Sequence, residues 1–184
     1  MKSAIKSIKE RQASAYEAMK GGFGYKNKLA APRLVKVVVS ATTGRSKDKN
    51  RNELVMGRLA KITGQRPSLR AAKKAIAGFK VREGDKIGVA VTLRGARMLG
   101  FLDKFLNVAT PRMRDFRGYE RKSVDEMGNL TIGVKEQTIF PETSDEDIKD
   151  IFGMAVTIVT TAKNKKEATK FFEVIGIPFK KQTA

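Results

Sequence analysis

The sequence predicts an α+β fold: a single domain over residues 1–184, in which an antiparallel β-sheet carries helices mainly on one face. Three observations favour this class. β-branched apolar runs alternate with amphipathic stretches, no regular strand–helix–strand repeat is evident, and several predicted strands are close enough in the chain to be antiparallel neighbours. With 41% hydrophobic residues, the chain can build a packed core. We expect the other face of the sheet to be free for a partner.

The N-terminal third is predicted to fold as helix, strand and helix. Ser3–Lys20, within an N-terminal helical segment 1–22, has apolar residues at helical spacing and is followed by two glycines, which end helices. The β-branched run Leu34–Val39 predicts a strand. Lys47–Ile62 again has helical spacing, and Gly64 follows it as a stop.

The middle of the chain is predicted to add strands around one apolar helix. Lys86–Leu93 is a continuous apolar run that predicts a strand, and Ala96–Val108 has the broad apolar face of a buried helix. Pro111–Gly128 is polar and predicts an irregular loop. Short strands are expected at Asn129–Val134 and Glu136–Phe140.

The C-terminal part is predicted to begin with a short acidic helix and to end with a strand and a helix. Thr143 or Ser144 would cap the acidic helix, Met154–Thr161 is a strand, and Lys165–Val174 is a helix. The acidic segment supports three interpretations: a metal or acid/base site, a capped and solvated helix, or a surface that docks a basic protein. Its carboxylates are Glu142, Asp145, Glu146, Asp147 and Asp150.

Composition points to a polyanionic partner. The chain has 38 Lys and Arg against 19 Asp and Glu, a formal net charge of +19, which attracts phosphate over long distances. No apolar run approaches the roughly 20 residues that span a bilayer, so we expect no membrane partner. The chain has no cysteine and no histidine, which excludes disulfides, thiolate metal sites and histidine-based catalysis. We therefore expect an intracellular, non-enzymatic protein without cofactor or metal.

The positive charge gathers in three clusters beside glycine or proline. The most continuous one, residues 61–82, contains seven Lys or Arg residues, no acid, and a break at Ala77-Gly78. Loops of this kind can follow a phosphate backbone, and nearby aromatic residues such as Tyr25, Phe79 and Phe116 can meet unpaired bases. Phe79 could equally belong to the core. Nucleic acid is therefore the expected partner.

Spaced motifs identify a family. Residues 77–84 (Ala-Gly-Phe-Lys-Val-Arg-Glu-Gly), 91–98 (Val-Thr-Leu-Arg-Gly-Ala-Arg-Met) and 111–118 (Pro-Arg-Met-Arg-Asp-Phe-Arg-Gly) occur in the expected order, followed by motifs within 128–142, 157–163 and 178–179. Together they strongly resemble the bacterial-type large-subunit ribosomal protein five family, whose members bind 5S rRNA. The resemblance runs from about Tyr25 to Lys180. It departs at Ser40–Gly44, where the family usually has Asn-Met-Gly-Val-Gly.

This resemblance implies a structural protein of the central protuberance in the cytoplasmic ribosome. Its implied partners are 5S rRNA, large-subunit rRNA, P-site tRNA, a small-subunit head protein and neighbouring large-subunit proteins. Three groups of residues carry over. The rRNA-binding group is Tyr25, Asn27, Lys28, Arg33, Lys36, Thr42, Thr43, Gly44, Gln65, Arg66, Arg70, Thr92 and Arg94; the tRNA-proximal group is Lys73, Lys74, Gly78, Phe79, Lys80 and Arg82; the inter-subunit bridge group is Arg112, Arg114, Asp115, Arg117, Glu142, Asp145 and Asp147.

Two other functions remain open at this point. One is a free-standing RNA chaperone, which would not sediment with large subunits. The other is a histidine-free, metal-dependent nucleic-acid enzyme that uses Glu142 or Asp145. Magnesium-dependent cleavage of RNA would distinguish the enzyme from a ribosomal protein.

Overall fold

The structure is a computed structural model that describes residues 6–44, 50–144 and 151–180. Five strands form one sheet in the order β2-β3-β1-β5-β4. The chain divides into two compact units, one of Met1–Val37, Arg94–Ile132 and Thr157–Ala184, the other of Val38–Leu93 and Gly133–Val156. The principal elements are α1 (Ile8–Phe23), β1 (Leu34–Thr42), α2 (Arg51–Thr63), β2 (Ser68–Ala71), β3 (Lys86–Leu93), α3 (Gly95–Lys104), β4 (Leu130–Val134), β5 (Met154–Thr160) and α4 (Lys165–Ile175).

Neighbouring strands are antiparallel. The start of β1 meets the end of β5, because Thr161 N donates to the Arg33 carbonyl at 3.0 Å. The end of β1 meets the start of β3, since Thr43 N donates to the Ile87 carbonyl at 2.9 Å. β2 pairs antiparallel with β3, and Gly128 O accepts from Thr160 Oγ1 where β4 begins and β5 ends. The α+β fold class is confirmed.

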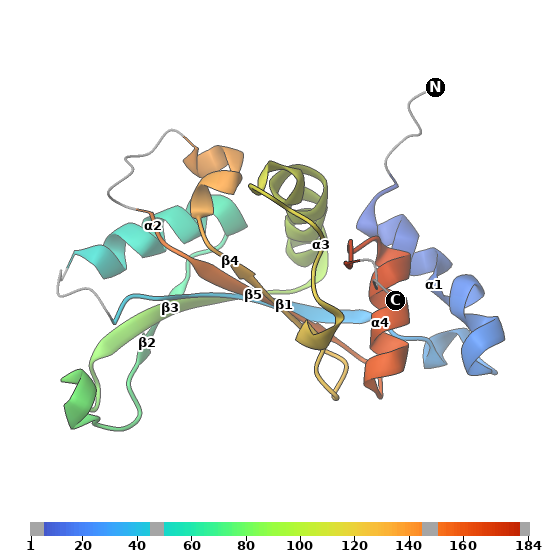
Figure 1. Cartoon of the computed structure of the whole chain (residues 1–184), viewed down its shortest axis with the longest axis horizontal. Coiled ribbons are helices and arrows are strands. Elements are labelled where there is room, and N and C mark those ends of the chain that lie inside the picture. The colour runs from blue at the N-terminus through green and yellow to red at the C-terminus, as the bar shows by residue number, and fades with distance from the viewer. Residues whose placement is uncertain (1–5, 45–49, 145–150, 181–184) are drawn as a thin grey trace. The chain divides into compact units, whose positions relative to one another are not determined.

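In the first unit, α1 and α4 lie side by side and α3 packs against α1 (Figure 1). Their apolar faces are buried: Ile8, Ala15 and Met19 of α1, with Phe171 and Phe172 of α4. After α3 the chain continues as a π-helical turn over Phe105–Ala109. Residues on β4 and β5 alternate between buried and more exposed, so these strands present one covered face and one open face.

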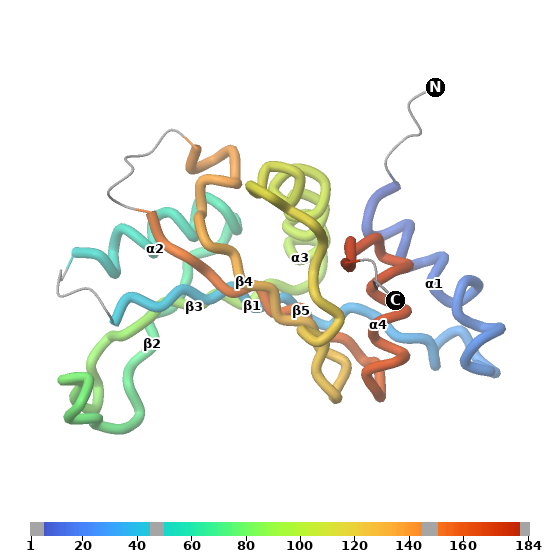
Figure 2. Tube along the Cα trace, viewed as in Figure 1, coloured from blue at the N-terminus to red at the C-terminus, as the bar shows by residue number. Residues whose placement is uncertain are grey.

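In the second unit, α2 packs against β3 and against a 3₁₀ turn, η7 (Pro141–Thr143). Val55, Leu59 and Ile62 form its buried stripe. Figure 2 shows β2 and β3 running side by side, with the connecting chain extending beyond them as a hairpin. This hairpin, residues 72–85, carries a 3₁₀ turn at its tip, η2 (Ala77–Phe79).

Two boundary predictions at the N-terminus are wrong. The first helix begins at Ile8, because Ser7 and Glu10 form a reciprocal capping box. Lys6 and Ser7, which were predicted to be helical, precede it, while the predicted start at Ser3 lies outside the described residues. The helix also continues through Gly21 and Gly22 to Phe23. The stop is Gly24, whose positive φ of 64° closes the helix end.

The strand predicted at Glu136–Phe140 is also wrong. The segment forms a 3₁₀ turn, η6 (Gln137–Ile139), held by the fully buried Gln137, whose side-chain oxygen accepts from Phe152 N at 2.7 Å. The Thr143 hydroxyl donates to the Gln137 carbonyl at 2.8 Å and so serves this turn. The predicted acidic helix beyond Ser144, like the start of the second predicted helix at Lys47, lies outside the described residues.

Candidate nucleic-acid interface

In the first unit, the segment between α1 and β1 presents predicted RNA contacts on a fixed backbone. Asn27 caps the short turn η1 (Lys28–Ala30), with its side-chain oxygen accepting from Leu29 N at 3.0 Å. Arg33 is pinned to Thr161, whose hydroxyl accepts from Arg33 N at 3.0 Å, while its guanidinium side chain stays exposed. Lys28 and Arg94 are also exposed, and Lys36 is half-buried on β1.

Tyr25, a predicted RNA contact, also makes two contacts within the protein. Its hydroxyl donates to Glu167 of α4, and its ring stacks on Phe23 with centroids 5.9 Å apart and planes 14° apart. Burial, followed by the hydrogen bond to Glu167, raises the pKa of the Tyr25 hydroxyl well above its ordinary value. The hydroxyl is therefore committed to the protein, while the ring remains available at the surface.

Glu167, which holds Tyr25 in place and was not predicted to do so, is buried, with 5% of its surface exposed. One carboxylate oxygen accepts from Lys163 N at 2.7 Å and the other accepts from Tyr25, while Glu167 N donates to the Asn164 side chain at 2.9 Å. A signal was present, because Asn followed three residues later by Glu marks a helix start. This spacing does not predict that the Glu167 carboxylate also accepts a hydrogen bond from Tyr25, which is distant in the sequence.

In the second unit, the predicted contacts at the end of β1 divide by exposure. Thr42 and Gly44 are exposed, whereas Thr43 is buried and its hydroxyl donates to the Asn52 side chain. The backbone N–H groups of Thr43 and Gly44 both donate to the Ile87 carbonyl, at 2.9 and 3.0 Å. The polar surface at this strand end therefore comes from Thr42 and from exposed backbone at Gly44.

The predicted contacts near β2 and β3 lie on these paired strands or directly beside them. Gln65 donates through Nε2 to the Thr92 carbonyl at 3.2 Å, which joins two of the predicted residues directly. Arg66 precedes β2, and Arg70 lies on it opposite Gly88; both arginines are exposed. The structure thus brings Gln65 and Thr92 together. It places Arg66 just before the edge strand β2, and Arg70 on that strand beside a register shift between Arg70 and Ala71.

The tRNA-proximal group occupies the 72–85 hairpin of the same unit. The hairpin is closed by Ala72 N to the Asp85 carbonyl at 2.8 Å and, near its tip, by Ile76 N to the Val81 carbonyl at 2.9 Å. Phe79 is 78% exposed at the tip, so it is not a core residue. The other predicted residues, Lys73, Lys74, Gly78, Lys80 and Arg82, are exposed as well.

The bridge residues of the first unit lie on the irregular segment after the π-helical turn. This segment is anchored by Tyr119, whose backbone N–H donates to the Pro178 carbonyl at 2.7 Å and whose carbonyl accepts from Lys180 N at 2.9 Å. Burial raises the pKa of the Tyr119 hydroxyl, which lies 3.0 Å from Thr110 Oγ1. Arg112, Arg114, Asp115 and Arg117 are all exposed along it.

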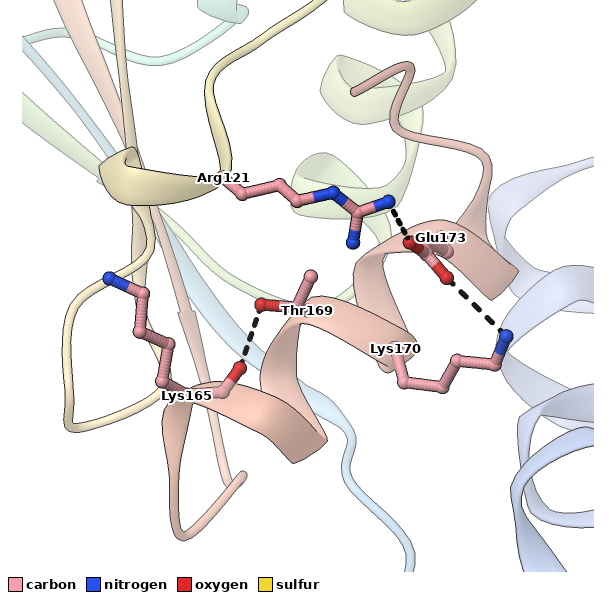
Figure 3. A network of polar contacts seen from close by, with 5 residues as sticks. All are labelled: Arg121, Lys165, Thr169, Lys170 and Glu173. Atoms are coloured by element: carbon pink, nitrogen blue, oxygen red, sulfur yellow. Dashed lines mark hydrogen bonds and ion pairs between the residues drawn. The ribbon is translucent and has the colours of Figure 1, made fainter. Parts of the chain in front are cut away.

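A network of polar contacts ties this segment to α4 (Figure 3). Arg121 pairs with Glu173 at 2.7 Å, and Glu173 also pairs with Lys170 at 3.4 Å. The Arg121 guanidinium also lies over the Phe179 ring, 5.4 Å from its centroid. In contrast, the ammonium group of Lys165 extends away from α4 and meets none of the residues drawn.

The acidic part of the predicted bridge is only partly visible. Glu142 is exposed on η7, while Asp145 and Asp147 lie outside the described residues. Within residues 6–44, 50–144 and 151–180, no group of three or more carboxylates is placed to hold a metal ion. No described helix is long and apolar enough to cross a membrane.

Comparison with known proteins assigns the family. Residues 27–82 match the model of ribosomal protein L5, and residues 86–179 match the model of the C-terminus of that ribosomal family. Large ribosomal subunit protein uL5 from Heliobacterium modesticaldum is 49% identical over 94% of this chain and 97% of its own length. The proteins of the same name from Alkalilimnicola ehrlichii and Cupriavidus metallidurans are 45% and 50% identical over 96% and 86% of this chain, and 99% and 88% of their own lengths. The chain therefore belongs to the ribosomal protein L5 family.

Proposed function

We propose that this protein attaches 5S rRNA to the large subunit in the central protuberance, reaches P-site tRNA with its 72–85 hairpin, and bridges to a protein of the small-subunit head. Family membership already makes it a structural constituent of the large ribosomal subunit and not an enzyme, which removes the nuclease alternative. We expect it to act in the cytoplasm, where ribosomes translate.

The observation that supports the 5S rRNA assignment most directly is a set of exposed arginines that make no ion pair and, at two positions, extend from hydrogen-bonded main chain. Arg33, Arg66 and Arg70 are exposed, and their side chains make no ion pair with any residue that the structure describes. Because strand pairing or a backbone hydrogen bond fixes the main chain at Arg33 and Arg70, little order must be created when phosphates bind. Arginine also suits bidentate phosphate contacts.

A salt titration of 5S rRNA binding tests this function. The logarithm of the binding constant should fall linearly with the logarithm of salt concentration, by about 0.7–0.9 per phosphate neutralised. Arg33→Ala and Arg66→Ala should each weaken binding and make this slope shallower. Lys9→Ala, which removes an exposed cation on α1 outside the predicted group, is the matched control. A binding constant that does not respond to salt would contradict the proposal.

The hairpin assignment rests on its closed geometry and its charge. Lys73, Lys74 and Lys80 project from a hairpin whose strands are already hydrogen-bonded, so the tip can extend toward a second RNA without refolding. Replacing these three lysines by alanine should leave 5S rRNA affinity unchanged and weaken the contact with tRNA on assembled subunits. An equal loss of 5S rRNA binding would contradict this division of labour.

The bridge assignment draws on Pro111–Gly118 and Val134–Asp150. The first segment is positioned by the Tyr119 anchor, and Glu142 supplies an exposed carboxylate to the second. A basic head protein would be attracted to the carboxylates. Reversing the charge with Glu142→Lys should slow subunit association at low salt more than at high salt, whereas an unchanged association rate would contradict the bridge.

A further inference from the structure

The first unit contains a pocket that none of the predicted groups uses. It has a volume of about 360 Å³ and is lined by Phe23 at the end of α1, Glu126 from the turn before β4, and Asn164, Lys165 and Lys166 at the start of α4. This volume lies at the lower end of the ~300–1,000 Å³ range of small-ligand sites. The pocket therefore has room for one small planar group rather than for a long segment of chain.

An aromatic platform forms one wall. Phe23 is 37% exposed and stacks on Tyr25 with planes 14° apart, so an incoming planar ring would extend an existing stack. Tyr25 is in turn tied to the buried Glu167 of α4. Because Glu167 lies in the first turn of the helix that carries Lys165 and Lys166, the platform and the two lysines are held together by one structure.

The polar side of the pocket suits a phosphate. The ammonium groups of Lys165 and Lys166 make no ion pair or hydrogen bond with any described residue. Glu126 is the one carboxylate in the lining, and it can accept a hydrogen bond from a base amino group. An aromatic face beside two free cations is the arrangement that single-stranded nucleic acid recognises, by base stacking and phosphate pairing. An acidic peptide would use the lysines but would leave the aromatic stack unextended.

We propose that this pocket binds one unpaired nucleotide of 5S rRNA, with its base stacked on Phe23 and its phosphate held by Lys165 and Lys166. The choice of 5S rRNA rests on the proposed function, because Tyr25 of the platform belongs to the predicted 5S rRNA surface and is followed in the chain by Asn27 and Lys28 of the same group. The pocket adds a stacking contact to the phosphate contacts proposed for Arg33, Arg66 and Arg70. It also gives the first unit a place for an unstacked base.

The test is the affinity of the full-length chain for 5S rRNA over a range of salt concentrations. Phe23→Leu keeps apolar volume but removes the ring, and should weaken binding at least about 5-fold without changing the salt slope. Phe23→Trp should bind like the unsubstituted protein. The double variant Lys165→Ala/Lys166→Ala should make the slope shallower by about 0.7–0.9. Lys6→Ala/Lys9→Ala removes the same charge from exposed positions at the start of α1 and should change the slope less.

The outcomes separate this inference from the proposed function. If Arg33→Ala weakens 5S rRNA binding while Phe23→Leu does not, the pocket inference is wrong and the proposed function stands. If the chain fails to bind 5S rRNA at all, both are wrong. Weakened binding to large-subunit rRNA alone, or to an acidic protein alone, would likewise overturn the assignment. Ultraviolet cross-linking of a 5S nucleotide to the peptide containing Phe23 is the direct positive result.

Discussion

Removing one hydroxyl group, by Tyr25→Phe, should destabilise the protein measurably. That hydroxyl donates to the carboxylate of Glu167, which is 5% exposed and therefore cannot replace the lost partner fully with water. The substitution keeps the ring and hence its stack on Phe23. The change thus isolates one hydrogen bond between the segment after α1 and the start of α4.

The expected magnitude follows from the charge of the acceptor. A hydrogen bond to a charged group contributes about 1.5–3 kcal/mol, roughly twice the value for a neutral pair. Glu167 keeps its bond from Lys163 N at 2.7 Å, so the carboxylate loses one of two partners and is not stripped completely. In a chain of this size, about 1 kcal/mol shifts Tm by about 2–4 °C. We therefore expect Tyr25→Phe to lower Tm by about 3–12 °C.

Urea unfolding followed by circular dichroism measures this loss, and a double-mutant cycle with Glu167→Gln assigns it. If the bond carries the effect, the two substitutions should be non-additive by about 1 kcal/mol or more. Tyr16→Phe is the control: it removes a hydroxyl from α1 that bonds to no described residue, and it should change the free energy of unfolding by less than about 0.5 kcal/mol. Equal effects of Tyr25→Phe and Tyr16→Phe would refute the reasoning.

Alkaline pH, the C-terminal tail and the hairpin tip give three further expectations. Because the pKa of the Tyr25 hydroxyl is raised in the folded protein, its contribution to the free energy of unfolding is complete below about pH 10, the pKa in the unfolded chain, and is lost as pH rises toward the folded pKa. In urea unfolding at about pH 9 and 11, the free energy of unfolding should therefore decline less for Tyr25→Phe than for the unsubstituted protein. Gly118→Ala, at φ 97°, would place a Cβ 2.7 Å from Lys180 N, and should lower the free energy of unfolding by about 1–3 kcal/mol, unlike Gly133→Ala, which has open space around it. Phe79→Ala should leave Tm unchanged, because the ring is 78% exposed, but weaken tRNA binding with an unaltered salt slope.

The elements that sequence predicts well are those with a continuous local signal. The strand predicted at Lys86–Leu93 has those bounds in the structure, because an apolar run there is bordered by the turn residues Gly84 and Asp85. The helix predicted at Lys165–Val174 ends one residue later, at Ile175, before Gly176. In both segments the local preference and the packing agree.

The elements that sequence predicts poorly depend on contacts made at a distance. A strand was predicted at Glu136–Phe140, but the side chain of Gln137 accepts from Phe152 N, fifteen residues away, and the segment forms a 3₁₀ turn. Gly21 and Gly22 look like a helix stop, but α1 continues to Phe23. The helix is instead closed at Gly24, which has a φ of 64° and whose N–H donates to the Lys20 carbonyl at 3.1 Å.

The contacts of the acidic residues explain why the charge pattern of the sequence predicted the basic loops but not the hydrogen bonds that hold their backbone in place. In a chain of net charge +19, carboxylates could be expected to neutralise neighbouring cations. Several instead accept backbone N–H groups: Asp85 from Arg82 at 2.7 Å, Asp103 from Ile8 at 2.8 Å, and Asp125 from Asn129 at 2.6 Å.

Glu167 follows the same pattern with Lys163 N and adds the Tyr25 hydroxyl. Each of these bonds fixes a loop or a helix start. In the 72–85 hairpin and at the start of α4, Lys73, Lys74, Lys165 and Lys166 make no ion pair with any residue that the structure describes. A phosphate that approaches these four lysines meets cations that need not be released from ion pairs. The acids therefore favour RNA binding indirectly, by ordering the basic loops while leaving their charge available to the partner.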